Sequence, residues 1–204
     1  MRIAVVSEVS ARDKNGMIVR ALEEAVPSAQ ILNAGMSENG DEPELTYIHT
    51  GLIAALTLYS GAADFVVGGC GTGQGFLLSA MQYPGVFCGL VTDPVDAWLF
   101  SQINAGNCVS LALNKGFGWA GDINLRYIFE KLFCDKAGRG YPIHRSESQQ
   151  ASRTALERVG KTTKRSMPEI LQSLDPAITS RVMCHEPFLR CASEIGKKHE
   201  PVTW

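Results

Sequence analysis

Short apolar runs alternate along the chain with longer segments whose apolar residues recur at helical spacing. Runs rich in β-branched and other apolar residues are typical of buried strands, and spacings of three to four indicate helices. The strand-like runs cover residues 2–7, 29–35, 63–69, 86–91 and 108–113, and the helix-like segments cover 14–26, 44–61, 76–83, 94–104 and 121–133. Five apolar strands alternating with helices predict a parallel sheet covered on both faces. With right-handed crossovers, the fold class is a doubly wound, five-stranded α/β sandwich of the flavodoxin or Rossmann-like kind.

The pattern changes after residue 134. Residues 135–145 are polar and contain Gly and Pro, residues 146–165 look like a charged, exposed helix, and residues 167–198 predict two or three short helices. We therefore expect an α/β domain at 1–145 and a helical C-terminal extension at 146–204. An extension of this size is too small to bury a core of its own, so it should pack on the domain or on a partner subunit.

Composition and charge narrow the possible partners and location. The 204 residues carry a net charge of −2, which gives no electrostatic case for a nucleic-acid or membrane-surface partner. The first residues lack the apolar region of a secretory signal, and no apolar run is long enough to span a membrane. The six cysteines form no C-x-x-C pair and no zinc-like spacing. We expect a cytoplasmic protein whose cysteines are thiols, with no metal and no cofactor.

The segment GGCGTGQG, residues 68–75, follows the third expected strand and leads into a helix. In open α/β sheets, ligands bind outside the carboxyl ends of the strands, and glycine-rich turns before helices suit anions. A dinucleotide fingerprint belongs after the first strand, where this chain has no glycine cluster. A Walker loop is also excluded, because no Lys-Ser/Thr pair closes the segment. The loop therefore predicts a site for a phosphate or an oxyanion, while a close-packed glycine turn is the structural alternative.

Cys70 lies in the middle of this loop. A single cysteine after a strand is most often a small buried hydrophobic residue. Its place before a helix favours the thiolate form, and a thiolate there could take a proton from a carbon beside a carbonyl. The backbone N–H groups of Gly71 to Gly75 could then hold the enediolate.

The stretch DFVVGGCGTGQG resembles the Cys-Gly-Thr-Gly-x-Gly loop of the type B ribose-5-phosphate isomerases and the galactose-6-phosphate isomerase subunits, over roughly residues 1–134. The resemblance implies that Cys70 transfers the proton in an aldose–ketose isomerisation and that Thr72 assists at the substrate oxygens. It also implies that the loop amides hold the enediolate, with Gly71, Gly73, Gln74 and Gly75 at the substrate. Some relatives have a serine in place of the cysteine and a glutamate four residues later as the base. Here that later residue is Gln74, which cannot ionise.

Other family positions are matched in part. The first strand ends in Ser7-Glu8-Val9, which keeps the acid of the family and replaces its histidine by Val9. The histidine that opens the sugar ring in the family is replaced by Ile103, so the substrate is already acyclic or another histidine, His49 or His144, opens the ring. Further substrate-binding candidates from the resemblance are Glu8, Tyr47, His49 and Asn104, with Arg12 and Arg145 for a phosphate and Arg139 and Arg153 as alternatives.

We therefore expect a metal-independent aldose–ketose isomerase acting on a small sugar or sugar phosphate. The resemblance also implies a homodimer with shared active sites. The alternative is a non-catalytic sugar-phosphate-binding protein with the same fold. A flavin-binding flavodoxin-like protein is disfavoured, because the turn after the first strand lacks the hydroxyl-rich phosphate loop such a protein needs.

Overall fold

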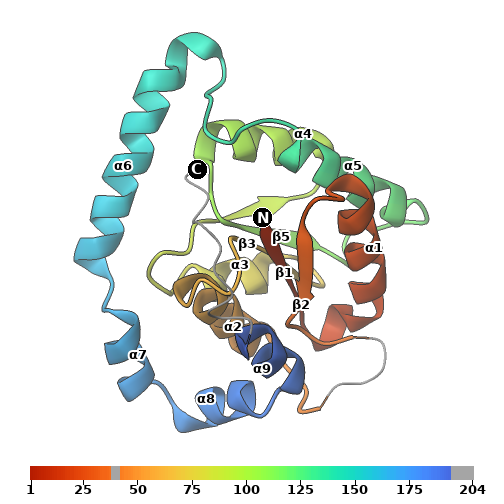
Figure 1. The fold of residues 1–204 in the computed structure, drawn as a ribbon, viewed down its shortest axis with the longest axis vertical. Coiled ribbons are helices and arrows are strands. Elements are labelled where there is room, and N and C mark those ends of the chain that lie inside the picture. The colour runs from red at the N-terminus through yellow and green to blue at the C-terminus, as the bar shows by residue number, and fades with distance from the viewer. Residues whose placement is uncertain (38–41, 194–204) are drawn as a thin grey trace.

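The computed structural model describes residues 1–37 and 42–193. Its centre is one sheet of five parallel strands in the order β2-β1-β3-β5-β4 (Figure 1). The strands are β1 (Arg2–Ser7), β2 (Gln30–Asn33), β3 (Phe65–Cys70), β4 (Cys88–Val91) and β5 (Cys108–Ala112). All residues of β1 and β3 are buried, whereas the edge strands β2 and β4 are partly exposed. The structure confirms the parallel sheet with buried central strands.

Helices cover both faces of the sheet and make it a three-layer sandwich. One face carries α1 (Asn15–Ala25), α4 (Pro94–Leu99) and α5 (Gly121–Phe133), and the other carries α2 (Tyr47–Tyr59) and α3 (Gln74–Ala80) (Figure 1). Each face has its own apolar core, centred on Leu22 and Phe129 on the first and on Leu52 and Phe76 on the second. A 3-10 segment, η1 (Val9–Lys14), precedes α1, and a π-helical turn, η2 (Phe100–Asn104), continues α4.

Strand β3 lies at the middle of the sheet and pairs with β1 on one side and β5 on the other. The helices that follow β1 and β5 lie on one face, and the helix that follows β3 lies on the other. Ligands of open α/β sheets bind at the carboxyl ends of adjacent strands whose following loops diverge in this way. The loop after β3 diverges from the loops after both of its neighbours, β1 and β5. The flavodoxin order 2-1-3-4-5 differs in its last two strands, and the pattern of apolar runs did not distinguish the two.

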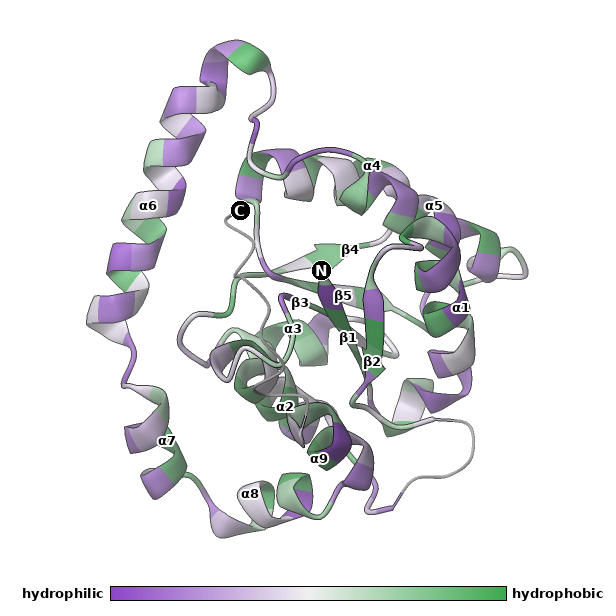
Figure 2. Ribbon diagram, in the orientation of Figure 1, coloured by the Kyte–Doolittle hydropathy of each residue, from purple (hydrophilic) through white to green (hydrophobic). Residues whose placement is uncertain are grey.

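The C-terminal extension is helical, as expected. It begins after the 3-10 turn η3 (Ile143–Arg145) and contains α6 (Ser146–Thr163), α7 (Met167–Ser173), α8 (Pro176–Met183) and α9 (Glu186–Ser193). The expected helices reach residue 198, and residues 194–198 lie outside the described part of the chain. Helix α6 stands away from the sheet with polar and apolar residues interspersed along it (Figures 1 and 2), and none of its residues is buried.

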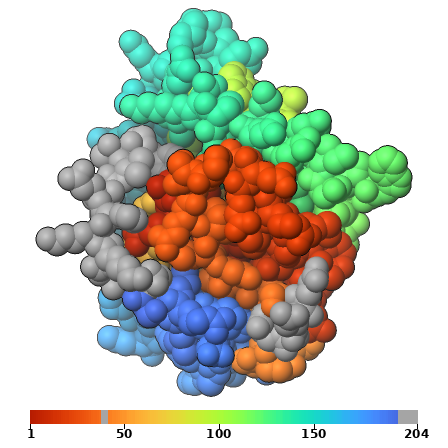
Figure 3. All heavy atoms as spheres, turned by 45° about the vertical axis from the view of Figure 1, so that its right-hand side comes forward, coloured from red at the N-terminus to blue at the C-terminus, as the bar shows by residue number. Residues whose placement is uncertain are grey.

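The last helices of the extension pack on the domain of the same chain. Met167, Val182, Phe188 and Cys191 are buried in the core that includes α2. Helix α9 contacts α2 and β2, and Figure 3 shows the blue C-terminal helices against the orange N-terminal segments. The extension was expected to pack on its own domain or on a partner subunit, and the described residues of α8 and α9 pack on the domain of their own chain.

Candidate active site

The glycine-rich segment forms the end of β3, a short loop and the start of α3. Cys70 is the last residue of β3, and α3 begins at Gln74, two residues earlier than the apolar spacing predicted. The glycines of the strand have packing roles: a Cβ at Gly68 would lie 2.1 Å from the Phe76 ring, and one at Gly69 would lie 2.5 Å from the Leu111 carbonyl oxygen. The structural alternative, close packing, therefore explains part of the cluster.

Gly73 turns the chain from the strand into the helix. Its φ is +75°, a conformation that residues with a Cβ adopt only at a cost. Its N–H donates to the Cys70 carbonyl at 3.3 Å, and its carbonyl accepts from Ser110 Oγ at 2.6 Å. The first bond closes the turn after β3, and the second ties it to β5.

The Cys70 side chain is only 6% exposed. Its sulfur lies 3.9 Å from Thr72 Oγ1, which accepts a hydrogen bond from the Gln74 N–H at 3.3 Å. Because the Thr72 oxygen accepts there, its own proton is available for the Cys70 sulfur or for a substrate oxygen. Thr72 itself is exposed. The loop thus places a thiol beside a hydroxyl that reaches solvent.

Glu8, at the end of β1, belongs to the same end of the sheet. Its side chain is 4% exposed and accepts a hydrogen bond from Ser10 Oγ. Ser10 Oγ in turn accepts from the Gly71 N–H at 3.2 Å, and Asn114 Nδ2 donates to the Ser10 carbonyl at 2.8 Å. Sequence reasoning missed Ser10 and Asn114. Their place directly after strands that flank β3 was the available signal, since parallel strands end at one edge.

Tyr47 and His49 lie at the start of α2. A Cβ at Gly75 would be 2.9 Å from the Tyr47 ring, so the ring packs on the first turn of α3. His49 completes a capping box: its Nδ1 accepts from the Thr46 N–H at 3.1 Å. Burial, and secondarily the Arg181 charge, lower the pKa of His49. Its accepting Nδ1 makes it the neutral tautomer protonated on Nε2.

Arg12, in η1, also lies at the carboxyl edge of the sheet. Its guanidinium is 3.6 Å from the Glu44 carboxylate, and both side chains are solvent-exposed enough for the pair to be weak. Arg12 is therefore the arginine candidate on the Cys70 side of the molecule that a ligand anion could recruit.

Asn104 and Arg145 lie at the opposite end of the sheet. Asn104 ends η2, shortly before Cys108, and Cys108 pairs with Val66 at the start of β3, while Cys70 pairs with Ala112. The four steps from Val66 to Cys70 span roughly 13 Å at about 3.3 Å a residue. The backbone of residues 138 and 140 is bonded to Ser101 and Gln102 of the η2 segment, which puts η3, with His144 and Arg145, on the Asn104 side. Within one chain, these candidates do not share a small ligand with Cys70.

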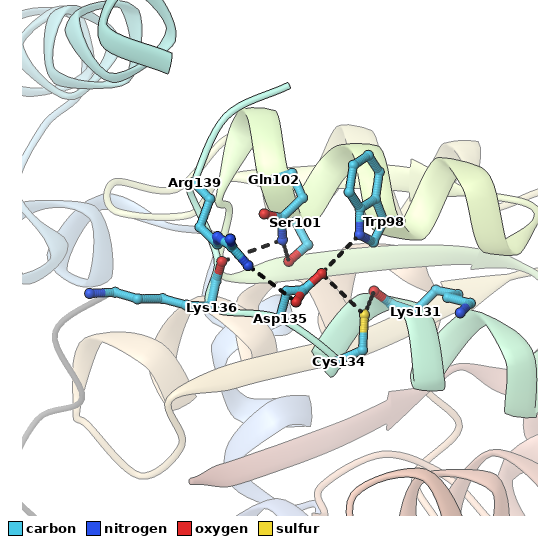
Figure 4. Close-up of polar contacts among 8 residues, drawn as sticks. All are labelled: Trp98, Ser101, Gln102, Lys131, Cys134, Asp135, Lys136 and Arg139. Atoms are coloured by element: carbon cyan, nitrogen blue, oxygen red, sulfur yellow. Dashed lines mark hydrogen bonds and ion pairs between the residues drawn. The ribbon is translucent and has the colours of Figure 1, made fainter. Parts of the chain in front are cut away.

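The alternative arginines on that side are engaged in structural contacts. Arg139 pairs with Asp135 at 3.4 Å, and Asp135 also accepts from the Trp98 indole at 3.2 Å (Figure 4). Arg153 donates to the carbonyls of Ile103 and Gly138, at 2.9 and 3.1 Å. Arg145 Nε donates to Ser148 Oγ at 3.2 Å, and its side chain is exposed. Arg145 is thus the freest of the three toward a ligand.

Cavities lie at both ends of the sheet. Two of about 280 and 300 Å³ adjoin each other near α6, and both are lined by Asn104, Arg153 and Leu156. A third, of about 250 Å³, is bounded by Thr72 and Lys115 at the carboxyl end. Among residues 1–37 and 42–193, no cluster of three or more His, Cys, Asp or Glu side chains could hold a metal ion. None of the helices described there has the length and apolar character needed to cross a lipid bilayer.

Comparison with known proteins identifies similar chains. The sequence model of the Ribose/Galactose Isomerase family matches residues 3–128. A ribose-5-phosphate isomerase structure from Vibrio parahaemolyticus is 44% identical, with a TM-score of 0.92 over 96% of this chain and 92% of that one. A 4-deoxy-L-threo-5-hexosulose-uronate ketol-isomerase, complexed with a tartrate, is 41% identical, with a TM-score of 0.91 over 94% and 91%.

More distant structures share the fold. The type B ribose 5-phosphate isomerase from Leishmania infantum is 17% identical, with a TM-score of 0.65 over 79% of this chain and 97% of that one. A search of curated protein sequences finds no significant match.

Proposed function

The chain belongs to the ribose/galactose isomerase family, and we propose that it is an aldose–ketose isomerase in which Cys70 moves a proton between C2 and C1 of a small sugar or sugar acid. The observation that carries this proposal is the placement of Cys70 at the carboxyl end of β3, 3.9 Å from the hydroxyl of Thr72, a residue that lines a cavity of about 250 Å³. A base beside a hydroxyl at such an edge is the arrangement that enediolate chemistry needs.

The reaction transfers two protons. The Cys70 thiolate takes the C2 proton of the aldose, the electrons form the C1–C2 double bond, and O1 becomes an oxyanion. The thiol then returns the proton to C1 while the O2 hydroxyl proton moves to O1, which gives the ketose. Thr72 donates to the oxygen that carries charge. Of the loop N–H groups expected to hold the same anion, those of Gly71, Gly73 and Gln74 already donate to Ser10 Oγ, the Cys70 carbonyl and Thr72 Oγ1. The Gly75 N–H is therefore the remaining candidate of the four. Glu8, Tyr47 and His49 line this end of the sheet as further candidates.

A second copy of the chain completes the site in this proposal. Asn104 and Arg145 lie at the other end of the sheet from Cys70, so they reach a substrate at Cys70 only from a partner subunit. Mixing Cys70→Ala with Asn104→Ala after partial denaturation should restore part of the activity, because a mixed dimer contains one intact site. Two inactive variants that stay inactive after exchange would exclude shared sites.

Ile103 favours an open-chain substrate. A sugar ring must open before its C2 proton can move, and isoleucine has no proton to give. The ketol-isomerase relative acts, by its name, on a 4-deoxy-5-hexosulose uronate. Such a molecule has no C4 hydroxyl and has a ketone at C5, so the hydroxyls that would close a ring onto C1 are missing. We therefore propose that the substrate is an acyclic sugar acid or sugar phosphate rather than a ring-closed pentose phosphate.

The test is a panel followed by NMR in deuterated water: ribose 5-phosphate, erythrose 4-phosphate and 4-deoxy-L-threo-5-hexosulose uronate. We expect product formation and deuterium incorporation with an acyclic member, and loss of both in Cys70→Ala. Cys134→Ala, at an exposed cysteine, is the matched control. Unchanged exchange in Cys70→Ala would remove Cys70 from the role of base. Thermal stabilisation by a panel member without exchange or turnover would instead support the sugar-phosphate-binding alternative.

A further inference from the structure

The peptide groups on both sides of Gly71 are hydrogen-bonded to the segments that follow β1 and β5, the two strands that flank β3. The Gly71 N–H donates to Ser10 Oγ at 3.2 Å, after β1. The Gly71 carbonyl accepts from the N–H groups of Asn114 and Lys115 at 3.0 and 2.8 Å, after β5. A Cβ at Gly71 would lie 3.2 Å from Asn114 Nδ2 and 3.4 Å from Ser10 Oγ. The residue that follows Cys70 is therefore enclosed between these two side chains.

Ser10 is itself held in one orientation. Its hydroxyl donates to the carboxylate of Glu8, which is 4% exposed, and its carbonyl accepts from Asn114 Nδ2 at 2.8 Å. A hydrogen bond to a carboxylate is stronger than one between neutral groups. A hydroxyl that donates such a bond also becomes a better acceptor. The result is a directional chain that runs from the buried Glu8 through Ser10 to the Gly71 N–H.

This chain acts on the peptide that joins Cys70 to Gly71. The carbonyl of that peptide, from Cys70, accepts from the N–H groups of Leu113 and Gly73 at 3.0 and 3.3 Å. Its N–H is the one that Ser10 accepts. Peptide groups are planar, so hydrogen bonds at both ends fix the plane and with it the direction in which the Cys70 side chain leaves the backbone.

We propose that Ser10 is a positioning residue for Cys70, with Glu8 acting through it. The proposal rests on the proposed function in that Cys70 is the base whose direction matters. It gives Glu8 a role as a holder of the loop, whether or not it also binds substrate. Asn114 supports the same arrangement from the β5 side, through its bond to the Ser10 carbonyl.

The test compares Ser10→Ala with Ser10→Thr, which keeps the hydroxyl, and with Ser60→Ala, an exposed serine at the end of α2, as the control. In Ser10→Ala we expect kcat to fall about tenfold, the change that about 1.4 kcal/mol of transition-state stabilisation produces. KM should stay near the wild-type value, because the bound substrate does not depend on the plane of this peptide. Ser10→Thr should restore most of kcat.

Two readouts do not depend on turnover. Hydrogen exchange of the Gly71 amide, followed by NMR on protein labelled with 15N-glycine, should accelerate in Ser10→Ala and return in Ser10→Thr. The pH profile of Cys70 alkylation by iodoacetamide, read by peptide mass spectrometry, should change in Ser10→Ala and not in Ser60→Ala.

Unchanged Gly71 exchange and Cys70 alkylation in Ser10→Ala would overturn the proposal. Changes in both, in a protein that isomerises no panel sugar, would support the positioning role while the proposed function fails. If Ser10→Ala does not fold, Ser10→Cys is measured in the same way, because a thiol keeps the size and is a weak acceptor.

Discussion

Gly73→Ala tests whether the loop after β3 is held by packing as well as by backbone conformation. Gly73 has a φ of +75°, and a Cβ there would lie 2.5 Å from Leu90 Cδ1 and 3.2 Å from the Ala112 N. Gly85 provides a matched control, since its φ is also +75° and no described atom lies within 4 Å of a Cβ at that position. The two substitutions share the backbone strain and differ in the contact.

The magnitudes follow from these two differences. Placing a residue with a Cβ in the left-handed region costs about 1–2 kcal/mol in the free energy of unfolding, and both variants incur this cost. Inserting a methyl group into a filled space costs about a further 1–3 kcal/mol, and only Gly73→Ala does so. For a chain of this size each kcal/mol lowers Tm by about 2–4 °C, so Gly73→Ala should melt about 2–12 °C below Gly85→Ala.

The assay is thermal unfolding by circular dichroism, with the isomerisation rate measured in parallel. We expect Gly73→Ala to be less active than the wild type even at temperatures where it is fully folded, because Leu90 or the loop must move to accept the methyl group. Gly85→Ala should keep the wild-type rate. Equal melting temperatures for the two variants would refute the reasoning, because they would show that the Gly73 contact with Leu90 and Ala112 relaxes at no cost.

Two further predictions concern His49 and the C-terminal helices. The pKa of His49 in the folded protein is lowered, chiefly by burial and secondarily by Arg181. Below about pH 6.5 the unfolded chain therefore binds more protons than the folded one, and the free energy of unfolding decreases as the pH is lowered. His49→Gln, which keeps an acceptor for the Thr46 N–H, should therefore lose less Tm than the wild type between pH 7 and 5; parallel Tm curves would contradict this. Phe188 is 4% exposed and lies in the core shared with α2. Phe188→Ala should lower the free energy of unfolding, measured in urea, by about 3–5 kcal/mol. Leu189→Ala, at a side chain 44% exposed, should stay within about 0.5 kcal/mol of the wild type, and equal losses would mean that α9 is only loosely attached.

Local pattern was sufficient for the elements of this protein and for the place of its central loop. The apolar runs marked all five strands. A strand buried on both faces needs apolar side chains throughout, which explains the runs of β1, β3 and β5, and the partly exposed edge strands β2 and β4 still carry apolar residues. Helical spacing marked the helices, with errors at their ends. Helix α2 starts at Tyr47, after its Thr46 cap, and α3 starts at Gln74, where Thr72 Oγ1 accepts the first free N–H. Such ends depend on single side-chain bonds that apolar spacing does not record.

The sequence by itself determined the α/β class, the position of Cys70 at the end of a strand and the family likeness of its loop, since these depend on neighbours along the chain. Only the tertiary structure decided the strand order, and with it the residues that surround the loop. Ser10 and Asn114 are 61 and 43 positions from Gly71 in the chain, yet both contact it or its partner, because β1 and β5 flank β3. The parallel register of β3 and β5 puts Asn104, which precedes β5, at the far end of the sheet from Cys70, which ends β3. Contacts between strand ends depend on which strands are adjacent, and that adjacency is set by the packing of whole helices on the two faces.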